Sequence, residues 1–249
     1  MTPFHALHAR GAPLLRLPNA WDVASALLFE RAGAPAVATT SAGVAWAHGF
    51  ADGEHLPLAD LVTAVARITR AVRVPVTVDL ERGYGDPALA VARVVAAGVA
   101  GVNLEDAAGP ADPFARALAA VRAAEPGVFV NARTCVALYR SVPPERLVAE
   151  ILARARRYAD AGADGLFVPG LIDAAAIEAV ARGTPLPLNV LALPGLPDAA
   201  ELARLGVRRL SVGMSLFATA YGAAASAWAE VTGGEAPAMS YRALDALFS

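Results

Sequence analysis

The chain has 249 residues, a formal net charge of −2 and 56% hydrophobic residues, which suits one large domain, residues 1–249, better than two small ones. The near-neutral charge, without a cluster of Lys and Arg, argues against nucleic acid or an anionic membrane as the partner, because both bind basic surfaces. We therefore expect a small-molecule partner. Cys135 is the single cysteine, which excludes an internal disulfide framework and a cysteine-based zinc cluster.

Two segments bear on localisation. The N-terminal stretch MTPFHALHARG lacks the apolar core of a signal peptide, so we expect a cytoplasmic protein. The segment 210–229 has no charged residue over a length that can cross a bilayer. It is rich in Gly, Ala, Ser and Thr, however, and Gly213 divides a strand-like part from a helix-like part. We expect no membrane span, but a helix that packs closely, against another subunit.

Short apolar runs recur along the chain, each followed by a turn and an Ala-rich amphipathic stretch. They predict eight strands, at 14–18, 36–40, 74–80, 101–105, 128–133, 164–169, 187–192 and 208–213. Helices are predicted between them, among others at 58–72, 87–97, 143–161, 174–181 and 198–205. Eight alternating units in a chain of this length predict an α/β protein with a (β/α)8 TIM barrel. A doubly wound sheet is the alternative, but no GxGxxG motif follows the first strand.

Polar residues gather at the C-terminal ends of five predicted strands. Residues two apart in a strand share a face, and the residues concerned are Asp79 with Glu81, Asn103 with Glu105, Asn131 with Arg133, Thr39 with Ser41, and Asn189 alone. In a barrel these strand ends meet at one mouth, where we expect a functional site. The alternative is that each pair is an exposed strand end hydrated by water.

Acidic residues dominate this set: Asp79, Glu81 and Glu105, with Asp106 as a further candidate. Their charges repel in a partly buried mouth unless a cation neutralises them or some of them are protonated. Oxygen ligands without Cys or paired His favour Mg2+, or alternatively Mn2+, over Zn2+. Because Mg2+ keeps several waters, we expect one carboxylate to bind it directly and the others to hold its waters.

Six segments, in this order, resemble the isocitrate lyase and phosphoenolpyruvate mutase superfamily: PNAWDVASA (18–26), TTSAGVAWAHGFADG (39–53), VDLERGYGD (78–86), GVNLED (101–106), NART (131–134) and NVLALPG (189–195). The resemblance covers nearly the whole chain. It implies a (β/α)8 barrel whose C-terminal helices are exchanged between the subunits of a homodimer or homotetramer. It also implies a Mg2+-bound α-keto acid or its enolate, next to which a carbon–carbon or carbon–phosphorus bond is cleaved or formed.

The resemblance also implies roles for individual residues. Asp79 is similar to the direct metal ligand, while Glu81 and Glu105 are similar to acids that act through waters, and Asp52 falls where the family has another acid near the metal. The implied substrate-binding residues are Ser41, Ala42 and Gly43 through their backbone, with Arg133 and Asn189 through their side chains. Trp21 and Asp22 follow the first strand, where they either contact the ligand or only pack and cap the next helix.

One segment departs from the family pattern. The lyases of the superfamily carry a mobile loop of the Lys-Lys-Cys-Gly-His type after the strand that ends in Glu105, and its cysteine protonates the enolate. This chain has DAAGPADPFAR at 106–116 instead, without Lys, Cys or His. Catalytic roles then fall to Arg133 and Glu105, with Cys135, His48 and Tyr84 as candidates for proton transfer. For Cys135 the alternative is a buried, inert thiol.

These observations predict a Mg2+-dependent lyase that cleaves a carbon–carbon bond of a 2-hydroxy or 2-oxo carboxylate and binds or releases a small α-keto acid through an enolate. A first alternative keeps the site but changes the bond, as an oxaloacetate-type decarboxylase or a phosphonopyruvate hydrolase or mutase. A second alternative is a keto-acid-binding protein without catalysis, for which only the altered 106–116 loop speaks.

Overall fold

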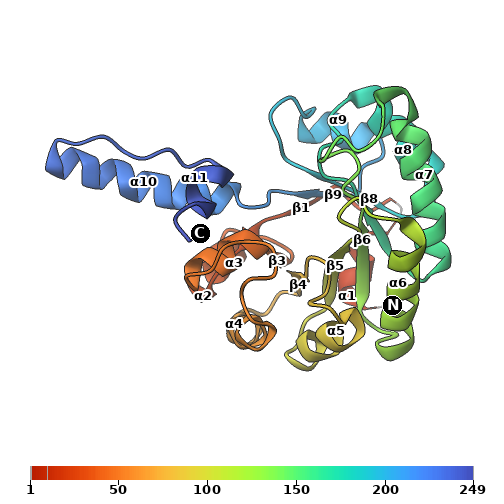
Figure 1. The fold of residues 1–249 in the computed structure, drawn as a ribbon, viewed down its shortest axis with the longest axis horizontal. Helices are drawn as coiled ribbons and strands as arrows, with labels where there is room; N and C mark the ends of the chain where they lie inside the picture. Colours follow the sequence, from red (N-terminus) through yellow and green to blue (C-terminus); the bar gives the residue numbers. More distant parts are fainter. Residues whose placement is uncertain (1, 10, 249) are drawn as a thin grey trace.

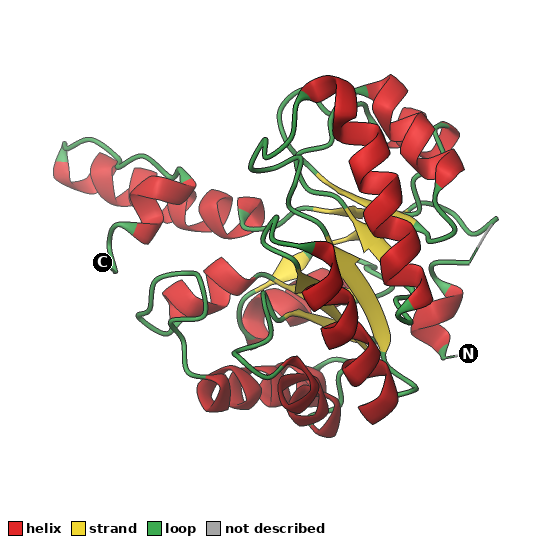
Figure 2. Ribbon diagram, turned by 45° about the vertical axis from the view of Figure 1, so that its right-hand side comes forward, coloured by secondary structure: helices red, strands yellow, loops and turns green. Residues whose placement is uncertain are grey.

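A ring of parallel strands forms the centre of the molecule, and helices surround it (Figure 2). The computed structural model describes residues 2–9 and 11–248. Within them the strands are β1 (Leu15–Leu17), β2 (Asn19–Ala20), β3 (Val37–Thr39), β4 (Val76–Asp79), β5 (Gly101–Glu105), β6 (Phe129–Arg133), β7 (Gly165–Phe167), β8 (Leu188–Leu191) and β9 (Arg209–Ser211). The strand order is β1-β9-β8-β7-β6-β5-β4-β3-β2. This confirms the predicted α/β barrel.

The ring closes through the first predicted strand, which Pro18 divides into β1 and β2. β1 pairs with β9 on one side, and β2 pairs with β3 on the other. Pro18 has no N–H to donate, but its carbonyl accepts a hydrogen bond from the backbone of Ala38 (N···O 2.9 Å). The predicted range 14–18 therefore ends too early, because the chain continues in strand pairing to Ala20 after the break.

The side chain of Asn19 fastens this closure. Its Nδ2 donates to the carbonyl of Thr39 on β3 (2.8 Å), while its Oδ1 accepts from the backbone N–H groups of Val212 and Gly213, which follow β9 (3.0 Å each). One buried amide thus joins the two strands on either side of the break.

The helices cover the outside of the barrel (Figure 1). The predicted helices at 58–72, 87–97, 143–161, 174–181 and 198–205 are present with ends shifted by at most two residues. In the described part of the chain the helices are α1 (Pro3–Ala6), α2 (Val23–Arg31), α3 (Ser41–Ala47), α4 (Leu58–Ala71), α5 (Pro87–Ala96), α6 (Ala111–Ala124), α7 (Pro144–Asp160), α8 (Ala174–Gly183), α9 (Ala199–Arg204), α10 (Ser215–Thr232) and α11 (Tyr241–Asp245).

Apolar side chains occupy much of the N-terminal end of the barrel interior, beside the buried His8. Phe4 of α1 is fully buried there, and its ring meets the edge of the Phe129 ring with the centroids 5.4 Å apart. Gly101 on β5 makes room for it, because a Cβ at this position would lie 2.6 Å from the Phe4 ring. This packing leaves the C-terminal end of the interior to the polar side chains.

Asp106 does not join the carboxylates of the mouth, although it directly follows Glu105. Its Oδ2 accepts hydrogen bonds from Arg154 Nη1 and Tyr158 Oη of α7 (both 2.7 Å). Its Oδ1 accepts from the backbone N–H groups of Ala108 (2.8 Å) and Cys135 (3.0 Å). Asp106 therefore ties the loop after β5 to α7 and to the end of β6, which is a structural role.

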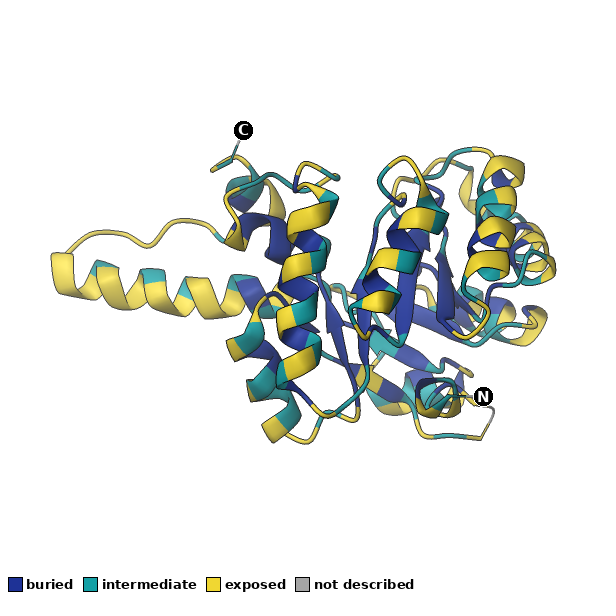
Figure 3. Ribbon diagram, turned by 90° about the horizontal axis from the view of Figure 1, so that it is seen from below, coloured by how far each residue is buried: buried dark blue, intermediate teal, exposed yellow. Residues whose placement is uncertain are grey.

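The uncharged segment 210–229 is divided at Gly213, as predicted, into the end of β9 and the helix α10. α10 projects away from the barrel (Figure 1), and most of its surface is exposed (Figure 3). Among the helices of the described residues, none has both the length and the apolar character needed to cross a membrane.

We expect Asp106→Ala to lower the free energy of unfolding by at least about 3 kcal/mol, because it removes the carboxylate that accepts four hydrogen bonds, from Arg154 Nη1, Tyr158 Oη and the backbone N–H groups of Ala108 and Cys135. Asp112→Ala is the matched control, since it breaks an exposed pair with Arg157 (2.9 Å) and is expected to cost no more than about 1 kcal/mol. Urea unfolding of both variants measures the difference. Equal losses would show that the Asp106 network is not the stronger anchor.

Candidate active site

A cavity of about 560 Å3 opens at the C-terminal ends of the strands. Five of the predicted site residues line it: Ser41, Ala42, Asp52, Asp79 and Arg133. The other lining residues are Asn19, Thr40, Asn103, Leu138, Tyr139, Phe167, Leu191, Leu193, Ser211, Gly213, Met214 and Tyr241. The parity of the strands thus brings together residues that are far apart in the sequence, at the mouth where the barrel fold places them.

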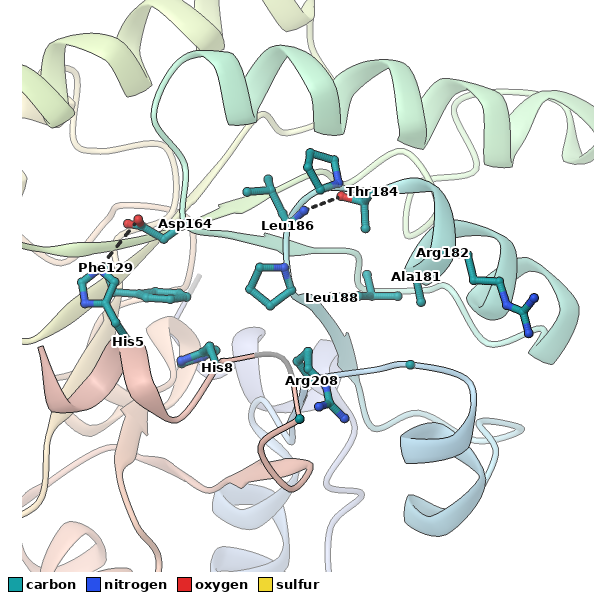
Figure 4. A pocket seen from close by; sticks show the side chains of 14 residues that line it. His5, His8, Phe129, Asp164, Ala181, Arg182, Thr184, Leu186, Leu188 and Arg208 are labelled. Carbon is teal, nitrogen blue, oxygen red and sulfur yellow. Dashed lines mark hydrogen bonds and ion pairs between the residues drawn. The ribbon is translucent and has the colours of Figure 1, made fainter. Parts of the chain in front are cut away.

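A larger cavity, of about 670 Å3, lies at the opposite, N-terminal end of the barrel (Figure 4). Its lining includes His5 and Asp164, whose Nε2 and Oδ1 atoms lie 3.7 Å apart. It also includes His8, which stacks on Phe129 and whose pKa is lowered to about 3 by burial and by Arg209. None of the predicted site residues lines this cavity.

Arg133 is the centre of the mouth. Its Nη1 lies 3.0 Å from Glu105 Oε2 and 3.7 Å from Asp79 Oδ2, and its guanidinium lies over the ring of Phe167, 5.6 Å from the centroid. The parallel register causes this arrangement, because β5 and β6 pair Glu105 directly with Arg133. Glu105 itself does not line the cavity. One cation therefore stands between two carboxylates from neighbouring strands.

The carboxylates of the mouth are held in an environment that disfavours their charge. Burial raises the pKa of Asp79 and of Glu105, against the lowering effect of Arg133 on both. The pKa of Glu81 is raised to about 8 by burial and then by the charges of Asp52 and Asp79. Such a cluster is stabilised when a cation enters it.

The chain turns sharply directly after β4, which ends at Asp79, and Glu81 lies in this turn. Glu81 and Tyr84 have left-handed backbone conformations (φ 50° and 56°), and Gly83 between them has φ 94°. The turn is held by Glu54, whose Oε1 accepts hydrogen bonds from the backbone N–H groups of Arg82 (3.0 Å) and Tyr84 (2.8 Å). Sequence reasoning missed Glu54, because it lies in a different loop and no sequence pattern indicates that its side chain bonds to the loop after β4.

The donor set fits a hydrated magnesium ion. In the described part of the chain, no three His, Cys, Asp or Glu side chains gather closely enough to hold an ion together, so an all-protein cage is not formed. Mg2+ does not need one, because it keeps most of its waters and binds through one or two carboxylates. Asp52 Oδ1 is buried and has no hydrogen-bond partner among the described residues. It can therefore accept a hydrogen bond from a water bound to the metal.

The start of α3 offers donors to an anion. Thr40, the N-cap residue, makes no side-chain hydrogen bond to the helix, so the first backbone N–H groups, at Ser41, Ala42 and Gly43, lack a capping partner. Ser41 and Ala42 line the cavity, and Gly43 lies just behind them. A Cβ on Gly43 would approach Thr40 Cγ2 to 2.7 Å, which explains the glycine.

Asn189 belongs to a polar network that continues below the cavity. Its Oδ1 accepts from Ser211 Oγ (3.2 Å), which in turn accepts from Arg209 Nε (3.1 Å). Arg209 is fully buried, both of its terminal nitrogens lack partners among the described residues, and burial lowers its pKa to about 9. Sequence reasoning missed Arg209 and Ser211, although their spacing of two at a strand end was the signal used for the other pairs.

Other predicted site residues do not line this cavity. Besides Gly43, Glu81, Glu105 and Asn189, which are described above, these are Trp21, His48, Tyr84 and Cys135. Trp21 and His48 line a separate cavity of about 290 Å3, and Trp21 packs against Phe217 (centroids 5.2 Å apart). Cys135 is fully buried behind Arg133 and Glu105, and burial raises its pKa to about 12. Tyr84 is partly buried beside Glu81, and burial raises its pKa.

Asp22 has the capping role that was the alternative to ligand contact. Its side chain accepts a hydrogen bond from the backbone N–H of Ser25 (2.7 Å), and Ser25 Oγ accepts from the backbone N–H of Asp22 (3.1 Å). This reciprocal pair is a capping box at the start of α2.

Two curated relatives resemble this chain. An uncharacterized protein of Mycobacterium tuberculosis strain H37Rv is 40% identical over 237 residues, which cover 93% of this chain and 90% of the relative. An oxaloacetate decarboxylase of Ectopseudomonas mendocina is 37% identical over 177 residues, which cover 64% of this chain and 59% of the decarboxylase.

Solved structures share the fold. A Burkholderia cenocepacia J2315 protein provisionally described as a phosphonomutase superposes with a TM-score of 0.86 at 45% identity, covering 90% of this chain and 96% of that one. A phosphonopyruvate hydrolase solved with oxalate and Mg2+ superposes with a TM-score of 0.79, covering 93% of this chain and 87% of that one. At 23% identity the second comparison supports the fold alone.

The sequence also matches the profile of the phosphoenolpyruvate phosphomutase family over residues 4–232. This range contains the whole barrel and every carboxylate of the mouth. The chain is a member of the phosphoenolpyruvate phosphomutase family, within the isocitrate lyase and phosphoenolpyruvate mutase superfamily of lyases and mutases.

Proposed function

We propose that the chain is a Mg2+-dependent carbon–carbon lyase that acts on a 2-hydroxy or 2-oxo carboxylate and binds or releases a small α-keto acid. The observation that carries this is the position of Arg133 between Glu105 and Asp79 beside the cavity. Mn2+ can occupy an oxygen site of this kind as well. The single, buried Cys135 accords with the reducing cytoplasm, where we expect the enzyme to act.

Asp79 would hold the metal directly, with Glu81, Glu105 and Asp52 accepting hydrogen bonds from its waters. When bound, Mg2+ supplies Lewis-acid stabilisation of the negative charge that develops on an α-keto oxygen. Arg133 donates to the same charge from the other side, and its planar guanidinium suits a carboxylate. The N–H groups that begin α3 receive the substrate carboxylate, and the amide of Asn189 supplies a further donor below the cavity.

Decarboxylation of an oxaloacetate-like acid is the second candidate, and two observations favour it. The loop between Glu105 and α6 carries no Lys, Cys or His, and the thiol of Cys135 is buried behind Arg133. Decarboxylation requires no positioned thiol, because solvent can protonate the resulting enolate. The 37% identity to an oxaloacetate decarboxylase supports the same reaction. A phosphonate substrate is disfavoured, since this loop adds no cationic side chain for its extra charge.

We expect purified protein with Mg2+ to form an α-keto acid from oxaloacetate or from a 2-hydroxy di- or tricarboxylate, as detected by proton NMR. Asp79→Ala should lower the rate by at least about a thousandfold, because it removes the metal ligand. Asp60→Ala, at an exposed position of α4, is the control and should keep the wild-type rate. If no substrate of this panel is turned over, or if Asp79→Ala is as active as Asp60→Ala, the proposed chemistry is wrong.

The raised pKa of Glu81 predicts a pH-dependent stability. A carboxyl whose pKa rises from 4.5 to about 8 on folding binds its proton more tightly in the folded state, so its stabilising contribution is lost as the pH rises between these values. We expect the melting temperature of metal-free protein to fall from pH 5 to pH 8, and the fall to be smaller in Glu81→Gln. Mg2+ should restore stability most strongly at pH 8. Identical pH profiles for both proteins would contradict the assignment.

We propose that the protein is a homodimer or homotetramer in which α10 packs against a second copy. α10 extends away from the barrel, and most of it is exposed (Figure 3). Its exposed side chains include Tyr221, Trp228 and Val231, and large apolar side chains on one projecting helix suit a subunit interface. We expect light scattering to give a mass of at least two chains, and Trp228→Glu to lower it. A monomeric mass for the wild type would contradict the proposal.

A further inference from the structure

The C-terminal segment of this chain reaches the active site although it lies beyond the residues that match the family. The family match ends at residue 232, and α11 begins at Tyr241. After α10 the chain turns back, and α11 packs against α3 at the barrel (Figure 1). Tyr241 lines the same cavity as Asp79 and Arg133. The sequence did not predict this position of Tyr241, because hydrophobic periodicity does not show where a short C-terminal helix packs.

Residues of α11 form hydrogen bonds with both the side chain and the backbone of Asp52. Tyr241 Oη donates to Asp52 Oδ2 (2.9 Å), and the backbone N–H of Asp52 donates to Asp245 Oδ1 (2.8 Å). Trp46 Nε1 donates to the same oxygen of Asp245 (2.9 Å), and the Trp46 and Tyr241 rings lie 5.6 Å apart. The loop that carries Asp52 is thereby fixed to α11 and to α3 together.

The hydrogen bond from Tyr241 uses one carboxylate oxygen of Asp52 and leaves the other for another partner. Oδ2 is occupied by Tyr241, whereas Oδ1 is buried and has no hydrogen-bond partner among the described residues. A buried carboxylate oxygen without a donor is costly, so a water or a hydrated cation is expected beside it. Burial and the charge of Asp52 raise the pKa of Tyr241, so its phenol stays protonated and donates the hydrogen bond.

We propose that Tyr241 is a positioning residue of the active site: it forms one wall of the substrate cavity and holds Asp52 so that Oδ1 accepts a hydrogen bond from a water of the metal at Asp79. This rests on the metal-dependent function proposed above. The role belongs to the hydroxyl group and not to the ring, since the ring contact with Trp46 can be made by phenylalanine as well. α11 is then part of the active site, together with the barrel strands.

The substitution Tyr241→Phe tests the role, with thermal unfolding followed during a Mg2+ titration. We expect the Mg2+ concentration that gives half of the maximal stabilisation to rise about tenfold, as for the loss of one hydrogen bond to a charged group. The melting temperature without metal should change by no more than about 4 °C. Tyr221→Phe is the matched control, because Tyr221 is 45% exposed against 46% for Tyr241, and it should leave the titration unchanged.

A double-mutant cycle shows whether Tyr241 acts through Asp52. Asp52→Asn alone should weaken the Mg2+ response, and Tyr241→Phe added to it should weaken the response no further, because the two residues serve one interaction. A normal Mg2+ response in Tyr241→Phe, or an additive loss in the double variant, would overturn the positioning role while leaving the metal site intact. The absence of any Mg2+ response in the wild type would overturn the proposed function and the role of Tyr241 together.

Discussion

The salt bridge between Arg133 and Glu105 is the interaction on which the mouth of the barrel depends. The parallel register of β5 and β6 sets these two residues side by side, and β4, the strand next to β5, brings Asp79 within 3.7 Å of the same Nη1 atom. Without this cation, the negative charges of Asp79 and Glu105 would repel each other in a poorly solvated part of the barrel. The strand register, which is set by the packing of the barrel, is therefore also what makes the acidic mouth compatible with a folded chain.

The site contains buried charged side chains, which destabilise the folded chain, and hydrogen bonds that offset part of this cost. Burial disfavours the charged forms of Asp79, Glu81 and Glu105, and it also disfavours the charge of Arg209 deeper in the barrel. Hydrogen bonds from outside the mouth compensate, as when Glu54 holds the loop after β4. Buried charges of this kind lower stability, and such a loss of stability is common at sites that bind a charged ligand.

The part of the site that could be predicted from the sequence is the part that the strands impose. A period of two determines which face of the strand a side chain takes, so the sequence alone places Asp79 and Arg133 at one mouth. The same period shows why Asp106 turns away from Glu105 toward α7. Loops obey no such period, so no sequence pattern shows that His48 lines a separate cavity, and Glu54 and Tyr241 were not found.

The closure of the barrel at Pro18 also shapes the folding of the chain. β1 lies near the N-terminus and pairs with β9, which almost the whole remaining chain separates from it. During synthesis, the edge of β1 therefore stays open until β9 has left the ribosome, and exposed strand edges invite pairing with other chains. Contacts so distant in sequence also form slowly. The Nδ2 of Asn19 can bond to Thr39 on β3 early, whereas its Oδ1 gains the N–H groups of Val212 and Gly213 only after β9 is made, so these two bonds accompany the completion of the ring.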